Sequence, residues 1–244
     1  MKLGIIGVGV VGRTLRDWFV ANTTHKLSLF DPGQNHLDEL AGSEYVFICV
    51  PVPTNISGAQ DISMLHEAIV RSKAQAPEAT IFIRSTVLPG TCDMYKNVFA
   101  MPEFLTERYA IRDMEQLNII VGGKSKIGIP SNLFLGKRVQ QYTNNEAEMI
   151  KYAHNCFAAV KVNFFNQIAD LCERQHRTMK YVNVLEGMNV SRLFELEQHT
   201  QVPGHDGKRG FGGKCLPKDL YAFATAYSIN SLLEVCKEND KIRG

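Results

Sequence analysis

A glycine-rich stretch near residue 215 carries a cysteine in a setting suited to nucleophilic chemistry. The stretch reads Gly-Phe-Gly-Gly-Lys-Cys-Leu-Pro-Lys-Asp over residues 210–219. Its glycines free the backbone to approach a ligand closely, and Pro217 is typical of the start of a helix. A helix N-terminus favours the thiolate form of Cys215, and Asp219 would lie one turn further along the same face. We therefore predict a nucleophile; the alternative is a buried structural cysteine.

A second glycine motif, near the N-terminus, has the form of a dinucleotide-binding turn. It follows a short apolar run, Lys2–Ile6, and precedes a helical pattern. Strand, glycine turn and helix in this order are the context that the dinucleotide fingerprint requires. The residues expected to contact the cofactor are Gly7, Val8, Gly9, Val10, Val11 and Gly12.

Asp31 indicates which dinucleotide binds there. It ends a second predicted strand, residues 26–30, roughly twenty residues beyond the glycines, where an acid binds the ribose 2′-hydroxyl. Because its charge would repel a 2′-phosphate, the sequence predicts NAD rather than NADP. A tight turn without a ligand would explain the glycines but not Asp31.

Further apolar runs predict the strands of a parallel sheet. They cover residues 45–50, 80–85, 97–100, 118–123 and 138–141, with a helix at 62–75 and no strand between residues 31 and 45. In open α/β sheets the ligand lies at the carboxyl ends of the strands. The further cofactor contacts expected there are Val50, Pro51, Pro53, Thr54, Ser85 and Thr86. The two prolines have an alternative role as loop punctuation.

Two acids lie on the same expected side of the sheet. Glu103 and Glu107 follow the strand predicted at 97–100 and are four residues apart. Such a pair usually marks a solvated face, but here it also falls where a ligand would bind.

One long amphipathic helix is predicted for residues 145–174. Lys151 and Asn155 lie one turn apart on a shared face, which is a solvated polar face unless the two side chains have a function. At about 30 residues the helix would extend about 45 Å. Its apolar stripe, with steps of three and four residues, consists of Ile150, Ala153, Phe157, Val160, Phe164, Ile168 and Leu171.

Shorter helices complete the second half of the chain. They are predicted at 179–188, 191–197, 217–227 and 231–238. Between them, Lys208 and Arg209 lie in a loop where they could meet a phosphate-bearing ligand.

The fold class expected is therefore α/β. A Rossmann-like, doubly wound and mostly parallel sheet forms an NAD-binding domain over residues 1–142. An all-helical domain built on the long helix, and carrying Cys215, follows over residues 143–244.

Composition and charge exclude several classes of partner. Hydrophobic residues make up 45% and charged residues 21% of the 244 residues, as in globular domains. A net charge of +2 does not indicate nucleic acid or an anionic membrane. No cysteine pair has metal-ligand spacing, so we expect no metal and a reduced, cytoplasmic setting. The N-terminal residues read as a strand rather than a signal peptide, and no apolar run could span a bilayer.

Together these motifs resemble the nucleotide-sugar dehydrogenases, the UDP-glucose and GDP-mannose 6-dehydrogenase family. The resemblance covers essentially the whole chain. The matching stretches, in the family's order, are residues 7–12, 49–54 (Cys-Val-Pro-Val-Pro-Thr), 85–87 (Ser-Thr-Val), 102–107 (Pro-Glu-Phe-Leu-Thr-Glu), 148–155 (Glu-Met-Ile-Lys-Tyr-Ala-His-Asn) and 210–219.

The resemblance implies a four-electron oxidation of a sugar C6 alcohol to a carboxylate, with NAD used twice. Cys215 would attack the intermediate aldehyde, and the resulting thiohemiacetal would be oxidised to a thioester that water hydrolyses. Lys151 and Asn155 would stabilise negative charge on oxygen.

The resemblance also assigns the remaining roles. Thr86 and Asp219 would hold a water that shuttles a proton, and Glu103 would activate the hydrolytic water. Glu107 would lie near the nicotinamide, and Lys218 would approach NAD. The residues expected to contact the nucleotide-sugar substrate are Glu103, Phe104, Leu105, Lys151, Asn155, Phe211 and Gly212.

Some features depart from the family. Its members carry a third, C-terminal domain over the nucleotide half of the substrate, and this chain is expected to end before it. The stretch between Asp31 and Tyr45 is shorter than in relatives, and Val52, Met101 and Arg108 replace the usual Thr, Asn and Gly.

The expected assembly is a homodimer formed through the long helix and the chain end. One alternative is an NAD-binding partner subunit, or a degenerate module, that needs a separate chain for the missing domain. Another is a dehydrogenase of a smaller substrate, a free sugar or sugar phosphate, read by Lys208 and Arg209.

Overall fold

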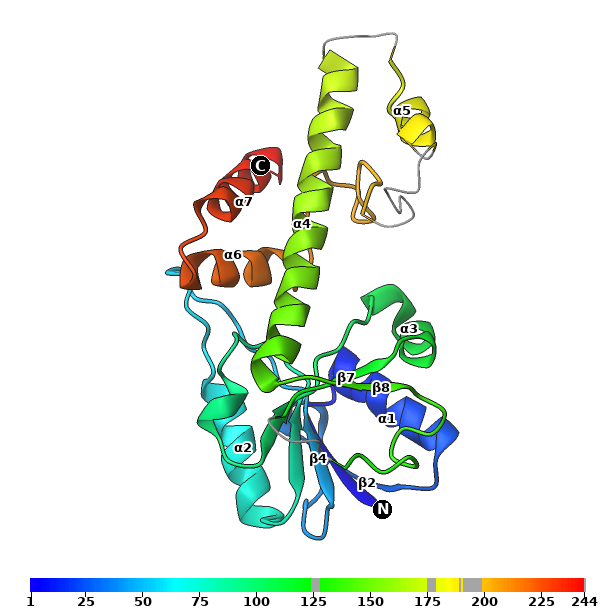
Figure 1. Cartoon of the computed structure of the whole chain (residues 1–244), viewed down its shortest axis with the longest axis vertical. Helices are drawn as coiled ribbons and strands as arrows, with labels where there is room; N and C mark the ends of the chain where they lie inside the picture. Colours follow the sequence, from blue (N-terminus) through cyan, green and yellow to red (C-terminus); the bar gives the residue numbers. More distant parts are fainter. Residues whose placement is uncertain (124–127, 175–178, 189, 191–198, 244) are drawn as a thin grey trace. The chain divides into compact units, whose positions relative to one another are not determined.

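The computed structural model describes residues 1–123, 128–174, 179–188, 190 and 199–243. The chain packs into two units (Figure 1). Unit 1 consists of Met1–Pro53 and Gln60–Lys151, and unit 2 of Thr54–Ala59 and Tyr152–Gly244. The domain boundary expected at residue 142 stays a prediction.

Unit 1 is built on a six-stranded sheet with the order β3-β2-β1-β4-β5-β6. All neighbouring pairs are parallel except β2 with β3, so the Rossmann-like fold is confirmed. The strands are β1 (Lys2–Ile6), β2 (Lys26–Asp31), β3 (His36–Leu37), β4 (Tyr45–Ile48), β5 (Thr80–Ile83) and β6 (Val98–Ala100).

The edge strand β3 corrects the expectation of no strand between residues 31 and 45. After the short 3-10 turn Pro32–Gln34, Asn35 adopts a left-handed conformation with φ 58°. The chain thereby reverses, and Leu37 pairs antiparallel with Phe30. The carboxylate of Asp38 accepts a hydrogen bond from the Leu29 N–H at 2.9 Å, which closes the edge.

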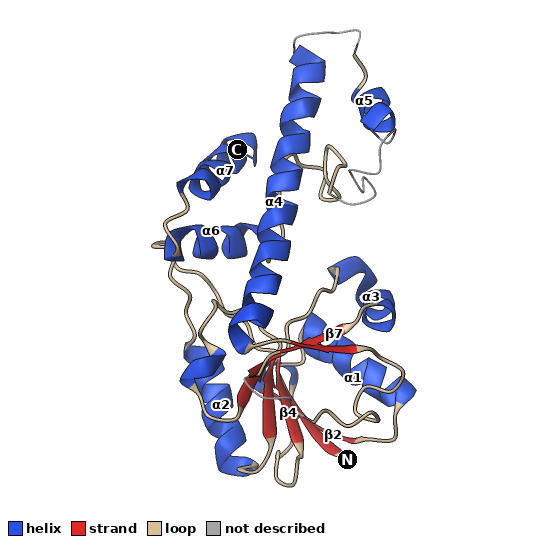
Figure 2. Ribbon diagram, in the orientation of Figure 1, coloured by secondary structure: helices blue, strands red, loops and turns tan. Residues whose placement is uncertain are grey.

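Alternating side chains bury both faces of this sheet. Val46 and Ile48 pack with α2 (Ser63–Gln75) on one face. Phe47, between them, packs with α1 (Val10–Asn22) on the other face. A further helix, α3 (Ala110–Gln116), joins α1 and was not expected from the sequence. Figure 2 shows α2 on one side of the strands, with α1 and α3 on the other, which is the doubly wound arrangement.

The two last strands of unit 1 do not close the main sheet as expected. β7 (Ile119–Val121) and β8 (Val139–Gln141) form a separate two-stranded parallel sheet. A side chain takes the place of a strand at the edge of β6, because Asn144 Oδ1 accepts a hydrogen bond from the Ala100 N–H at 3.0 Å. Asn144 Nδ2 also donates to the Val98 carbonyl at 3.3 Å.

The second half of the chain is helical, as predicted. The described helices are α4 (Asn144–Arg174), α5 (Tyr181–Met188), α6 (Leu216–Ala226) and α7 (Asn230–Arg243). α4 begins in unit 1 and continues into unit 2, and α7 extends five residues beyond the predicted end at residue 238. The helix expected at 191–197 lies outside the described residues.

The buried face of α4 differs from the predicted apolar stripe. Phe157, Phe164 and Leu171 of that stripe are 70%, 48% and 46% exposed. The buried face instead carries Tyr152, whose ring stacks on Phe223 of α6 with centroids 5.2 Å apart. Lys151 and Asn155 lie on this buried face, so the alternative of a solvated polar face is wrong.

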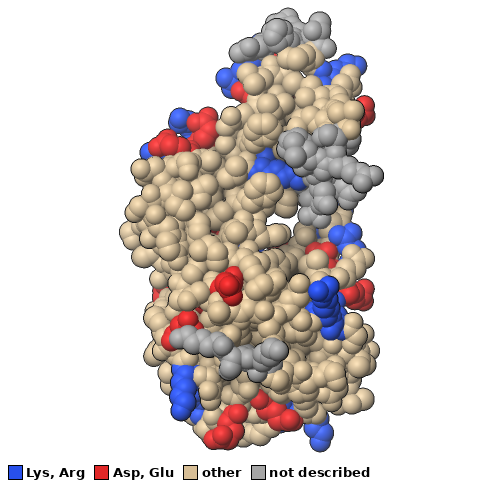
Figure 3. Space-filling view, in the orientation of Figure 1, with Lys and Arg blue, Asp and Glu red and all other residues tan. Residues whose placement is uncertain are grey.

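Charged side chains of both signs are interspersed on the face shown in Figure 3. This dispersion agrees with the small net charge of +2. Within the described residues, no helix has the length and apolarity needed to cross a membrane.

A six-residue loop, Thr54–Ala59, packs in unit 2 although both of its flanks belong to unit 1. Asn55 closes the loop, since its Oδ1 accepts a hydrogen bond from the Ala59 N–H at 3.0 Å. The Tyr221 hydroxyl on α6 donates to the Ile56 carbonyl at 3.0 Å. Gly58 has φ 85°, and a Cβ there would lie 2.3 Å from the Thr225 hydroxyl oxygen on α6.

Replacing Gly58 should therefore destabilise the protein through two separate effects. Alanine at positive φ costs about 1–2 kcal/mol, and the clash with Thr225 adds overpacking of about 1–3 kcal/mol. Gly136→Ala is the matched control, because Gly136 has φ 74° and no described atom within 4 Å of its Cβ position. In urea unfolding, Gly58→Ala should lose more stability than Gly136→Ala. Equal losses would show that the contact with α6 contributes nothing.

Candidate active site

The glycine turn after β1 has the geometry of a cofactor-binding loop. Gly7 has φ 84°, and a Cβ on Gly12 would lie 1.9 Å from the Gly7 carbonyl oxygen, so α1 packs closely against the turn. At Gly9, by contrast, no described atom lies within 4 Å of a Cβ position. The turn is therefore open at Gly9, in front of the N-terminal N–H groups of α1, where a phosphate binds well.

Asp31 lies at the same turn. Its Oδ2 accepts a hydrogen bond from the Val8 N–H at 2.7 Å and lies 3.4 Å from the Gln34 side-chain nitrogen. The carboxylate at the end of β2 is thus held beside the glycines. Open space at Gly9, the N-terminus of α1 and this acid together fit a dinucleotide with an unmodified ribose.

The carboxyl ends of β4 and β5 are joined beside that turn. The Ser85 hydroxyl donates to the Val50 carbonyl at 2.6 Å. Gln60, which the sequence did not single out, donates to the Thr86 carbonyl at 3.2 Å and accepts from the Leu88 N–H at 3.0 Å. Thr54, expected to contact the cofactor, lies in unit 2 and donates to the Lys218 carbonyl at 3.3 Å.

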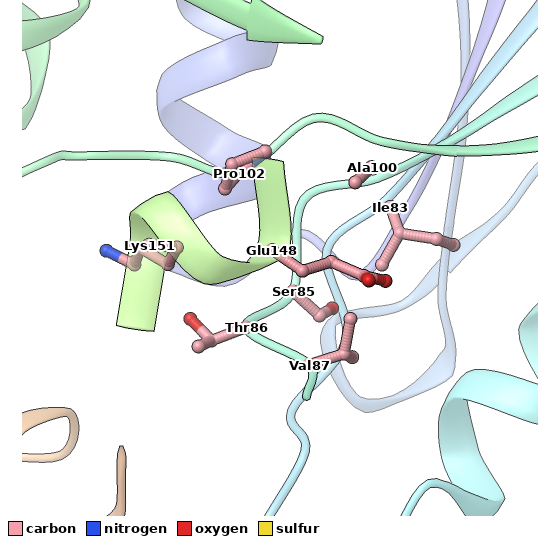
Figure 4. A pocket seen from close by; sticks show the side chains of 8 residues that line it. All are labelled: Ile83, Ser85, Thr86, Val87, Ala100, Pro102, Glu148 and Lys151. Carbon is pink, nitrogen blue, oxygen red and sulfur yellow. The ribbon is translucent and has the colours of Figure 1, made fainter. Parts of the chain in front are cut away.

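A small pocket in unit 1 brings two predicted catalytic residues together. Figure 4 shows the Thr86 side chain and the Lys151 side chain on the same side of it, with the Glu148 carboxylate extending the other way. The residues that line the pocket are Ile83, Ser85, Thr86, Val87, Ala100, Pro102, Glu148 and Lys151.

Lys151 forms a buried ion pair with Glu103. The Lys151 Nζ lies 3.3 Å from Glu103 Oε1, and their side chains are 6% and 10% exposed. The other carboxylate oxygen accepts a hydrogen bond from the Leu105 N–H at 2.6 Å. The Lys151 ammonium also lies 5.2 Å from the centroid of the Phe104 ring. Four residues predicted around the substrate thus form one cluster in unit 1, while Glu107 is exposed outside it.

Arg84 adds a second buried cation to this region, one that sequence reasoning missed. Its Nε and Nη1 have no hydrogen-bond partner among the described residues. Burial lowers the pKa of Arg84, and the neighbouring Cys49 and Glu103 raise it. Arg84 and Lys151 are thus two buried cations close to Glu103.

Glu148 supports the segment that follows Thr86. Its two carboxylate oxygens accept hydrogen bonds from the N–H groups of Gly90 and Cys92, each at 2.8 Å. Burial raises the pKa of Glu148, and these backbone donors lower it. Glu148 thereby ties α4, one turn before Lys151, to the loop beyond Thr86.

In unit 2, Cys215 occupies the N-cap position of α6, with Leu216 and Pro217 as the first helical residues. Among the six cysteines, all of which lie in the described residues, it alone is exposed. Burial raises the pKa of Cys49 and of Cys156 to about 12, which makes those thiols poor nucleophiles.

Asp219 lies one turn beyond Cys215 and is fully buried. Its Oδ2 accepts a hydrogen bond from Asn155 Nδ2 on α4 at 2.7 Å. Its Oδ1 pairs with the Lys218 ammonium at 2.5 Å, so the lysine expected near NAD is engaged with Asp219. The structure thus brings Asn155, Lys218 and Asp219 together in unit 2.

Phe211 and Gly212, which were predicted to contact the substrate, differ in their exposure. The Phe211 ring is buried, whereas Gly212 is partly exposed. Arg209, one of the two basic residues considered for a phosphate, pairs with Asp170 at 3.3 Å and with Glu173.

Comparison with known proteins places both halves of the chain in one family. Residues 33–129 match the NAD binding domain of the UDP-glucose/GDP-mannose dehydrogenase family, and residues 145–240 match its central domain. The chain belongs to this family. The expectation of NAD as cofactor is thereby confirmed for the domain that carries the sheet.

Individual relatives show the same likeness. A UDP-glucose 6-dehydrogenase from Rickettsia bellii is 31% identical over 232 residues, covering 84% of this chain and 51% of that protein. One from Rhizobium meliloti is 29% identical, covering 91% and 62% respectively. The chain thus spans about half the length of the curated relatives it matches first. The solved UDP-glucose dehydrogenase of Pyrobaculum islandicum shares the fold, with a TM-score of 0.82, 20% identity, and coverage of 99% of this chain and 67% of that one.

Removing one partner of the buried ion pair should be costly. Lys151→Met removes the ion-pair partner of the buried Glu103 carboxylate, and we expect a loss of about 3 kcal/mol in unfolding free energy. Adding Glu103→Gln to that variant should restore part of the loss. Lys237→Met, which removes an exposed pair with Glu234, should leave the urea midpoint nearly unchanged. Purely additive effects at residues 103 and 151 would contradict a coupled pair.

Proposed function

We propose that this chain oxidises the C6 alcohol of a nucleotide sugar to the carboxylate with NAD; relatives named UDP-glucose 6-dehydrogenase point to this class of substrate. The observation that carries the proposal is Cys215, exposed at the start of α6, with the buried Asp219 one turn further on. Family membership and the Lys151–Glu103 cluster of unit 1 support it.

The first oxidation converts the alcohol into an aldehyde. When bound, NAD accepts the hydride in this step and in the next oxidation. The alcohol proton passes to a water held by Thr86 and Asp219. Lys151, as a buried cation, and Asn155, as an amide donor, stabilise the negative charge that develops on the oxygen.

The second oxidation proceeds through a covalent intermediate on the chain. The Cys215 thiolate forms a C–S bond to the aldehyde carbon, and the carbonyl oxygen takes up a proton to give a thiohemiacetal. Loss of a hydride from that carbon and of the hydroxyl proton gives a thioester. Glu103 then takes a proton from water, which attacks the thioester carbon, and the Cys215 thiolate leaves as the carboxylate forms.

Two NADH per sugar should therefore form with the wild-type chain. Cys215→Ala should form at most one NADH per sugar and no carboxylate, because the aldehyde cannot be captured. Incubation with NAD and a panel of sugar nucleotides, followed by absorbance and product analysis, measures both. Cys236→Ala, which changes another cysteine of unit 2, is the control and should retain full stoichiometry. Absence of NADH with every sugar nucleotide, under conditions where a full-length relative works, would overturn the proposal.

The alternative of a smaller phosphorylated sugar receives less support. It depended on Lys208 and Arg209, and the Arg209 guanidinium is already neutralised by two acids of α4. Sugar phosphates belong in the same substrate panel as a comparison.

We also propose that the chain forms a homodimer through α4. Phe157, Phe164 and Leu171 recur at seven-residue steps and are exposed, which leaves an apolar stripe along one face of a long helix. Such a stripe is buried when a second copy of the helix covers it.

Charges placed on this stripe should therefore yield a monomer. Phe157→Glu with Phe164→Glu should halve the mass measured by light scattering, because a carboxylate cannot be buried unpaired in an apolar interface. Val70→Glu on α2, another exposed apolar residue, should leave the mass unchanged. A wild-type monomer, or a dimer that survives both changes, would refute the α4 interface.

A further inference from the structure

We propose that Asn239 and Arg243, both on α7, are positioning residues for the loop that carries Cys215. Nothing in the motifs of the sequence marks either residue. The proposal rests on the proposed role of Cys215 and adds the side chains that hold its loop in place. All of the contacts concerned lie within unit 2.

Asn239 binds the loop through both ends of its side-chain amide. Its Oδ1 accepts a hydrogen bond from the Phe211 N–H at 2.7 Å, and its Nδ2 donates to the Phe211 carbonyl at 3.1 Å. The residue is 3% exposed. A single buried amide thus satisfies both backbone groups of Phe211, as a neighbouring strand would, and fixes the orientation of that peptide.

Two other side chains hold the residues just before Phe211. Asn166 Oδ1, on α4, accepts a hydrogen bond from the Gly210 N–H at 2.9 Å. Arg243 Nη1 donates to the carbonyls of Arg209 and Gly210 at 3.3 and 3.2 Å. Arg243 Nη2 also pairs with Asp206 at 2.6 Å, further back along the same loop.

Side chains of α7 lie close to two glycines of the motif, Gly210 and Gly212, which gives a second reason for glycine at these positions. A Cβ on Gly210 would lie 2.5 Å from Asn239 Oδ1, and a Cβ on Gly212 would lie 2.6 Å from Arg243 Cζ. At Gly213, no described atom lies within 4 Å of a Cβ position. A side chain at Gly210 would thus meet Asn239, and one at Gly212 would displace the Arg243 guanidinium, whereas Gly213 faces open space beside Lys214 and Cys215.

These contacts affect the position of the Cys215 thiol. Only three residues separate Phe211 from Cys215, so fixing the Phe211 peptide limits where the N-cap of α6 can lie. A misplacement of about 1 Å in a reacting group can cost about 100-fold in rate. The α7 side chains thereby determine where the thiol stands.

The test compares the reactivity of Cys215 with turnover. Asn239→Leu keeps the side-chain size and removes both hydrogen bonds. It should lower kcat by at least about tenfold, with KM for NAD unchanged. It should also change the rate of Cys215 alkylation by iodoacetamide and its pH profile, because the thiol leaves the helix N-terminus. Lys241→Ala, which removes an exposed pair with Glu238 on the same helix, is the control and should change neither.

Further variants cover the case in which Asn239→Leu does not fold. Asn239→Asp keeps the acceptor for the Phe211 N–H and should show a smaller change in alkylation in the same direction. Gly212→Ala should displace the Arg243 guanidinium, so its effect on alkylation and that of Arg243→Ala should not add. Alkylation that is unchanged in folded Asn239 variants, or strictly additive effects at 212 and 243, would overturn the inference.

These readouts separate the inference from the proposed function. Alkylation requires no sugar nucleotide, so a change in it supports the α7 role even if the wild-type chain produces no NADH. Normal NADH production with unchanged alkylation in the Asn239 variants would refute the α7 role and leave the proposed function intact.

Discussion

The carboxylate of Asp219 is the constraint on which the proposed chemistry of unit 2 depends. It is fully buried, and a buried charge is tolerated only when paired and hydrogen-bonded. Asn155 and Lys218 satisfy one oxygen each. Because Asn155 lies on α4 while Asp219 and Lys218 lie on α6, this carboxylate joins the long helix to the helix that Cys215 caps. The residues proposed for catalysis are thus also the residues that keep these two helices together.

The same requirement explains why the buried face of α4 holds polar side chains among its apolar ones. Lys151, Asn155 and Asn166 all lie on its buried face, where each has a partner in its own unit. Phe157 and Phe164 lie on the exposed face. The buried face thus carries these polar side chains together with apolar ones such as Tyr152 and Phe165, and an exposed apolar stripe remains on the other face.

Sequence reasoning predicted the strands β1, β2, β4, β5 and β6 and the helices α1 and α2 of unit 1 because their signals are local. Alternation along Tyr45–Ile48, the glycines at 7–12 and an acid at residue 31 each depend on neighbours in the chain. It failed where packing between distant segments determines the structure. Periodicity shows which residues of α4 share a face, but not which face is covered. Likewise, the bond of Asn239 to Phe211 spans 28 residues. The edge of β6 is capped by one asparagine of α4, which no strand pattern could indicate.

The loop at residues 54–59, which packs in unit 2, affects where the chain could be divided or recombined with a relative. The chain passes between the units after residues 53, 59 and 151, so neither unit is one continuous segment. A fragment ending at residue 151 would retain the loop but lose the helix whose Thr225 requires Gly58. A chimaera that exchanges sheet units between relatives must therefore keep the six-residue loop with the helical parent. In this chain, packing rather than sequence order determines which segments must be exchanged together.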